Sequence, residues 1–93
     1  MNSSPARITL VESEGCHFCE EAHRLLAELG ARGDIELHAV DARSPEGLRL
    51  VGRYRPPMFP LVLWEDRHFS HGRLPVRKLA KRLAAHRDSA TVA

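Results

Sequence analysis

Four short segments carry the hydrophobic pattern of β-strands. Residues 35–40 alternate between apolar and polar side chains, as a strand with one buried face does. Residues 61–64 are apolar throughout, which indicates a buried strand. Glu65 and Asp66 form a predicted tight turn that leads into a returning strand. The predicted strands are therefore residues 7–12, 35–40, 61–64 and 67–70.

Two further segments show the features of helices. The first has apolar residues three or four positions apart, and we expect it to end at Gly30, a residue that readily adopts the left-handed conformation of a helix end. Ser44 and Pro45 mark the start of the second, as N-cap and first helical residue, and this helix should run to about Tyr54. The apolar positions of the first helix are Ala22, Leu25, Leu26 and Leu29.

A third helix is predicted near the end of the chain. It opens at Leu74 and Pro75, whereas the residues from Asp88 to Ala93 are expected to be frayed. The residues expected on its apolar face are Val76, Leu79, Ala80, Leu83 and Ala84.

The predicted elements follow the order β-α-β-α-β-β-α. A right-handed crossover makes the first two strands parallel, and the last two strands form a hairpin. The expected fold class is therefore α/β, with a four-stranded mixed sheet and helices on both faces. A length of 93 residues suits a single domain, 1–93, with a core from about residue 7 to residue 87.

The composition is that of an ordinary soluble globule, with 43% hydrophobic and 28% charged residues. No apolar run approaches the length of a membrane span, and residues 1–6 lack the apolar stretch of a signal peptide. We therefore expect a cytoplasmic protein without a membrane partner. Thiols are kept reduced in the cytoplasm, so the two cysteines are expected to be catalytic or metal-bound rather than a structural bridge.

Charge is unevenly distributed along the chain, although the net charge is only +2. Eleven acidic residues lie at or before Asp66, whereas seven of the basic residues follow it. A basic segment is compatible with nucleic-acid binding or with the solvated face of a helix. Phe69 is its one aromatic residue, so we favour the solvated face and expect no nucleic-acid partner.

The two cysteines, Cys16 and Cys19, form one Cys-x-x-Cys turn between the first strand and the first helix. Unpaired backbone N–H groups and the helix dipole favour a thiolate at such a position. This arrangement is typical of a thioredoxin-like redox motif. The alternatives are that the two cysteines are zinc ligands or that they are thiols without a chemical role.

The two thiols are expected to play different roles. Cys16 lies at the exposed helix start and should attack, whereas Cys19 lies one turn further in and should resolve the mixed disulfide. A protonated His17 would favour the Cys16 thiolate, and the alternative is a His17 that points into solvent. Nearby carboxylates at Glu14, Glu20 and Glu21 would oppose the thiolate.

The order of elements, the Cys-x-x-Cys motif and a proline before the third strand resemble the glutaredoxin-like branch of the thioredoxin superfamily. Three pieces within residues 7–87 carry the resemblance: residues 15–19, residues 58–60 and residues 70–72. It implies a glutaredoxin-like thiol–disulfide oxidoreductase that reduces protein or low-molecular-weight disulfides. It also implies a cis Phe59–Pro60 bond beside the dithiol, with an ordinary trans proline as the alternative. The substrate-binding residues it suggests are His17, Phe59, Pro60, His71 and Gly72.

Several positions depart from the glutaredoxin pattern. His17 and Phe18 replace the usual Pro and Tyr between the cysteines, and residues 11–14 lack the basic residue that helps to hold glutathione. Arg73 follows the turn where an acidic residue is usual. Efficient glutathione binding therefore does not follow from the resemblance. We expect a monomer without a bound cofactor, which receives electrons from a low-molecular-weight thiol (glutathione or another) or from a reductase.

The histidines support a second hypothesis, a metal- or iron–sulfur-binding thioredoxin-fold module without turnover. Cys16, Cys19 and His23 could supply three metal ligands, because His23 lies one helical turn beyond Cys19. A fourth ligand would come from His71 or from a second subunit. A cluster bound through one cysteine from each subunit is a related alternative.

Overall fold

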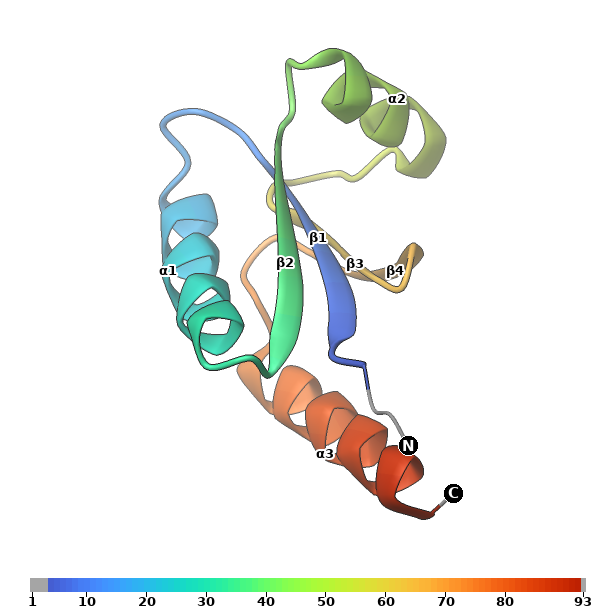
Figure 1. Cartoon of the computed structure of the whole chain (residues 1–93). Coiled ribbons are helices and arrows are strands. Elements are labelled where there is room, and N and C mark those ends of the chain that lie inside the picture. Colours follow the sequence, from blue (N-terminus) through green and yellow to red (C-terminus); the bar gives the residue numbers. More distant parts are fainter. Residues whose placement is uncertain (1–3, 93) are drawn as a thin grey trace.

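The protein folds into a mixed sheet flanked by helices (Figure 1). The computed structural model describes residues 4–92, with side chains to residue 88. Its element order matches the predicted one and confirms the α/β class. Within the described residues, no helix has the length and apolarity to cross a membrane. The elements are β1 (Ala6–Glu12), α1 (His17–Ala31), β2 (Ile35–Asp41), α2 (Pro45–Tyr54), β3 (Leu61–Trp64), β4 (Arg67–His71) and α3 (Val76–Val92).

The sheet has the strand order β2-β1-β3-β4. Strands β1 and β2 are parallel, and β3 pairs in the antiparallel sense with both β1 and β4. The predictions of a parallel first pair and a terminal hairpin are therefore confirmed. Glu65 and Asp66 both have positive φ, at 50° and 66°, as the tight turns that match strand twist require.

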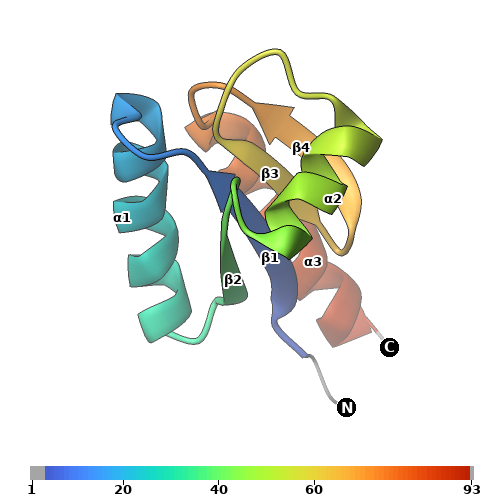
Figure 2. The ribbon, with the colours of Figure 1, turned by 90° about the horizontal axis from the view of Figure 1, so that it is seen from above.

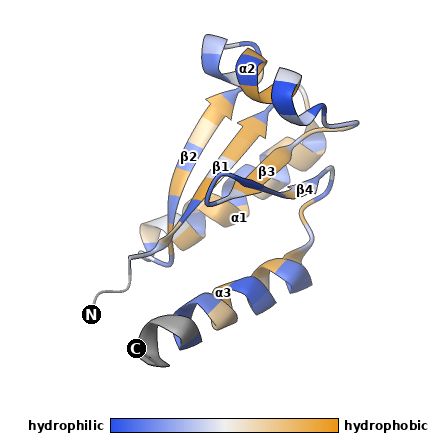
Figure 3. Cartoon of the chain, turned by 90° about the vertical axis from the view of Figure 1, so that its right-hand side faces the viewer, coloured by the Kyte–Doolittle hydropathy of each residue, from blue (hydrophilic) through white to orange (hydrophobic). Residues whose placement is uncertain are grey.

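Alternation along β1 and β3 divides the core into two layers. Ile8 and Leu10 face one layer, where they meet α1 and α3, whereas Val11 faces the other layer beneath α2. Figures 1 and 2 show α1 and α2 on opposite sides of the sheet, and Figure 3 shows β1 and β3 as largely apolar. The sheet therefore separates two apolar layers, and the expected coverage on both faces is confirmed.

The predicted end of α1 at Gly30 is wrong. The helix continues to Ala31, and the N–H of Arg32 still donates to the Glu28 carbonyl, at 3.1 Å. Gly33, with φ of +82°, takes the left-handed conformation that we assigned to Gly30. Gly30 itself lies within the helix, and a Cβ added there would make only an ordinary van der Waals contact, 3.7 Å from Leu37 Cβ.

The predicted apolar face of α3 is only partly correct. Leu79 and Leu83 are buried, but Val76, Ala80 and Ala84 are exposed. Basic side chains cover the core here instead, because the Lys78 amine lies 4.5 Å from the ring centre of Phe69 and the Arg82 guanidinium 5.4 Å from that of Trp64. The prediction that the chain is frayed from Asp88 onward is also wrong, because α3 continues to Val92. Ala93, the last residue of that prediction, lies outside the described residues.

Candidate functional site: a disulfide at the start of helix α1

Cys16 and Cys19 form a disulfide at the N-terminal end of α1. Cys16 is the N-cap residue, in an extended conformation, and is partly exposed. Cys19 lies in the first turn of the helix and is only 2% exposed. The two sulfurs therefore differ in access, and a substrate approaching from solvent meets Cys16 first.

Backbone N–H groups point at both sulfurs. The Cys19 N–H donates to Cys16 Sγ at 3.1 Å, which is the hydrogen bond of a side-chain N-cap. The Ser13 N–H donates to Cys19 Sγ at 3.5 Å. Donors of this kind, together with the positive end of the helix dipole, stabilise negative charge on sulfur once the disulfide is reduced.

The Phe59–Pro60 segment lies beside the disulfide. The peptide bond between these residues is cis, and the Phe59 carbonyl oxygen is 3.8 Å from Cys16 Sγ. Pro60 is fully buried, and its carbonyl accepts a hydrogen bond from the Gly72 N–H at 3.0 Å. Gly72 has a φ of +79°, and a Cβ at this position would lie 3.0 Å from Met58 Sδ. The fold thus joins residues 58–60 to the turn after β4, next to Cys16.

Two of the predicted site residues, His17 and His71, lie at the surface, and the ring of each contacts a neighbouring side chain. The His17 side chain is 77% exposed, and its Nε2 lies 3.3 Å from a carboxylate oxygen of Glu21, one helical turn away. His71 is also exposed, and its Nδ1 lies 3.1 Å from His68 Nε2. The structure therefore places His17 in the solvent-facing position that we considered as the alternative.

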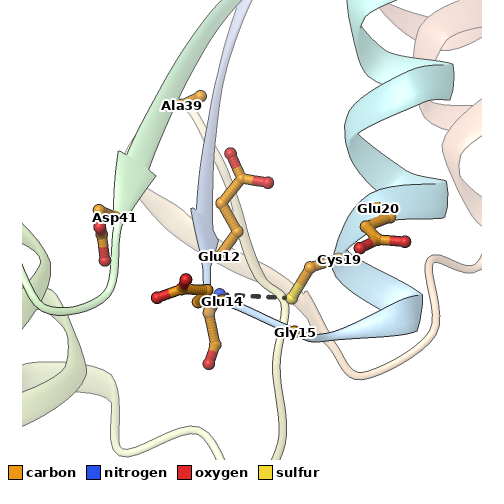
Figure 4. Close-up of a pocket in the computed structure, with 8 residues that line it drawn as sticks. Glu12, Glu14, Gly15, Cys19, Glu20, Ala39 and Asp41 are labelled. Carbon is orange, nitrogen blue, oxygen red and sulfur yellow. Dashed lines mark hydrogen bonds between the residues drawn. The ribbon is translucent and has the colours of Figure 1, made fainter.

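A pocket of about 400 Å³ opens beside Cys19 (Figure 4). The loop before α1 and the end of β2 form its walls, and acidic side chains dominate the lining. Glu12 also binds the His23 ring at 2.9 Å, and Glu14 binds the Arg43 guanidinium. The lining residues are Glu12, Ser13, Glu14, Gly15, Cys19, Glu20, Ala39 and Asp41.

The contribution of β2 to this pocket was missed by the sequence analysis. Ala39 and Asp41 are about twenty residues from the cysteines in sequence, yet they reach the same pocket. The register explains this, because Asp41 is the partner of Glu12 in the parallel pair. The available signal was the predicted parallel pairing itself, since ligand crevices form outside the carboxyl ends of parallel strands.

The side chains that we considered as metal ligands do not form a metal site in this disulfide-bonded structure. Across the described part of the chain, no group of three or more histidine, cysteine or acidic side chains has the arrangement of a metal site. His23 instead binds Glu12, and His71 contacts His68.

Comparison with known proteins places this geometry in context. Residues 7–84 match the Glutaredoxin-like domain (DUF836). Among solved structures, the chain is similar to an uncharacterised thioredoxin-like protein from Clostridium perfringens, with a TM-score of 0.65 and 14% sequence identity, over 90% of this chain and 72% of that one. The curated proteins give no match. The fold is therefore thioredoxin-like, and together with the Cys16–Cys19 pair it supports a redox-type role.

Proposed function

This chain belongs to the Glutaredoxin-like domain family, and we propose that it is a dithiol–disulfide oxidoreductase that reduces disulfides of proteins or small molecules. One observation carries the proposal, the difference in access between the two sulfurs. Cys16 is partly exposed at the helix start, whereas Cys19 is 2% exposed directly behind it. Thiol–disulfide exchange needs such a pair, one thiol to attack and one to resolve.

The proposed reaction transfers two electrons from the dithiol to the substrate. The Cys16 thiolate attacks one sulfur of the substrate disulfide, so the substrate S–S bond breaks and the first substrate thiolate leaves and takes up a proton. Cys19, after losing its own proton, then attacks Cys16 Sγ and releases the second substrate thiolate. The Cys16–Cys19 disulfide that remains must be reduced by a low-molecular-weight thiol or by a reductase.

The segment beside Cys16 is the proposed substrate contact. The Phe59 carbonyl already faces the Cys16 sulfur, so an extended chain bound to the Phe59 backbone would bring its own disulfide to that sulfur. Pro60 and Gly72 fix this segment through the hydrogen bond between them. His17 and His71 are further proposed substrate contacts, because both rings are exposed and a substrate can reach them.

A turnover assay tests the proposal. With dithiothreitol as reductant, wild-type protein should accelerate the reduction of a disulfide-bonded protein in proportion to its own concentration. The metal content and the visible spectrum of protein purified under reducing conditions provide the second measurement. A protein without exchange activity that carried stoichiometric zinc or iron would contradict the proposal and support the metal-binding alternative.

Glutathione is expected to be a poor electron donor, because its two carboxylates would approach a site edged by Glu12, Glu14 and Glu20. Glu20→Gln should therefore raise the glutathione-dependent rate by about 1.4- to fivefold, since an interaction between two exposed charges contributes about 0.2–1 kcal/mol. The measurement is this rate divided by the rate with an uncharged thiol, which corrects for any change in Cys16 reactivity.

Glu36→Gln is the matched control, because Glu36 is exposed on β2 and does not line the pocket. High salt should reduce the difference between wild type and Glu20→Gln, because it screens exposed charges. Efficient turnover of the wild-type protein at millimolar glutathione, unaffected by Glu20→Gln, would show that these carboxylates do not limit the donor.

A further inference from the structure

An irregularity in the edge strand β4 brings two histidine rings together. Leu61 pairs with His71 and Leu63 pairs with His68, so two steps along β3 correspond to three steps along β4. Residues three apart on a regular strand point to opposite faces of the sheet. The extra residue in β4 creates a β-bulge, and the bulge turns both histidine rings to the same face of the sheet.

The two rings meet through their nitrogen atoms. His68 Nε2 lies 3.1 Å from His71 Nδ1, the ring centres are 5.3 Å apart, and both residues are exposed. At this distance one ring donates a proton to the lone pair of the other. Two metal–nitrogen bonds of about 2.0–2.1 Å place their nitrogens about 2.8–3.0 Å apart at a right angle and about 3.3–3.4 Å apart at a tetrahedral angle. The observed 3.1 Å lies between these two values, so rotation of the two exposed rings is enough to direct both nitrogens at one metal ion.

We propose that His68 Nε2 and His71 Nδ1 form a chelating site for a divalent transition metal of the kind that prefers imidazole. Such metals include Zn²⁺, Ni²⁺ and Cu²⁺, and Cu²⁺ binds most tightly to a given set of nitrogen ligands. Since no third protein ligand joins the pair within the described residues, water completes the coordination. The site is thus an exchangeable one at the surface.

The surroundings leave this pair available to a cation. Arg67 precedes His68 on the strand, so its side chain starts from the opposite face. Arg73 lies beyond the turn, with its Nε 4.0 Å from a Glu21 carboxylate oxygen. The other histidines pair with different groups: His17 with Glu21, His23 with Glu12, His38 with Glu46 and His86 with the Ser4 carbonyl.

Copper binding to the disulfide-bonded protein tests the proposal. The disulfide removes both thiolates as ligands, so the result does not depend on the proposed redox function. Titration should give one Cu²⁺ site per chain that fills before any other, and pulsed electron paramagnetic resonance should detect two coupled imidazoles. His68→Ala and His71→Ala should each lower the affinity by at least about tenfold, the lower end of the 10–100-fold range that loss of an outer-shell partner costs, and should leave one imidazole.

His38→Ala is the matched control, because His38 is also exposed but pairs with the Glu46 carboxylate. It should leave both the affinity and the two-imidazole signal unchanged, and circular dichroism should show that all three variants are folded. A two-imidazole signal that persists in His68→Ala, or equal affinities in the wild type and both β4 variants, would overturn the proposal.

Discussion

Replacing Cys16 by serine is expected to reduce disulfide reductase activity to the uncatalysed level, whereas Cys19→Ser should still form a mixed disulfide with one substrate molecule. Cys16 is the N-cap of α1, and its sulfur accepts a hydrogen bond from the Cys19 N–H. Both features favour the thiolate that attacks. Cys19 is nearly inaccessible, so it can reach Cys16 but not an external disulfide.

Mass spectrometry of the trapped species distinguishes the two roles. Cys19→Ser, incubated with a disulfide substrate, should gain the mass of one substrate thiol on Cys16, and Cys16→Ser should gain none. In reduced wild-type protein, brief alkylation should label Cys16 before Cys19. Faster labelling of Cys19, or a stable adduct on Cys19 in the Cys16→Ser variant, would reverse the assignment.

The order of elements and the place of the dithiol could be predicted because their signals are local. Ser44, for example, accepts a hydrogen bond from the Gly47 N–H at 3.0 Å, as an N-cap residue should. The exact end of a helix is harder to predict, because more than one glycine can take the left-handed conformation that ends it. After α1 this residue is Gly33, not Gly30. The apolar face of α3 was misjudged because long basic side chains can also cover apolar surface: Val76 is exposed, whereas Lys78 and Arg82 lie over Phe69 and Trp64.

The surroundings of the dithiol depend on contacts that are distant in sequence. Asp41 reaches the pocket through the register of β1 with β2, and Arg43 reaches Glu14 across the same edge. The pairing of His68 with His71 depends on one extra residue in β4, and spacing alone places these rings on opposite faces. The sequence predicts each strand but not the register that brings such side chains together.

Close packing of α2 against the end of β2 makes Gly47 the most constrained glycine in this region. A Cβ at residue 47 would overlap the Asp41 carbonyl oxygen and would lie 2.8 Å from two backbone atoms of Ala42. Backbone atoms cannot rotate aside as a flexible side chain can. Either α2 must move away from the strand or the pocket edge at Asp41 must shift.

Gly47→Ala is therefore expected to destabilise the protein by about 1–3 kcal/mol, the usual cost of an overpacked site. Gly52→Ala is the matched control, because Gly52 lies in the same helix and a Cβ added there would meet no atom within 4 Å. Helix propensity alone should stabilise this variant by about 0.5–1 kcal/mol.

Urea denaturation measures both effects, because the free energy of unfolding falls with urea concentration by about 1–3 kcal/mol per molar. The midpoint should fall for Gly47→Ala and rise for Gly52→Ala. Equal midpoints would mean that α2 does not pack as closely on the Asp41 carbonyl as the structure shows.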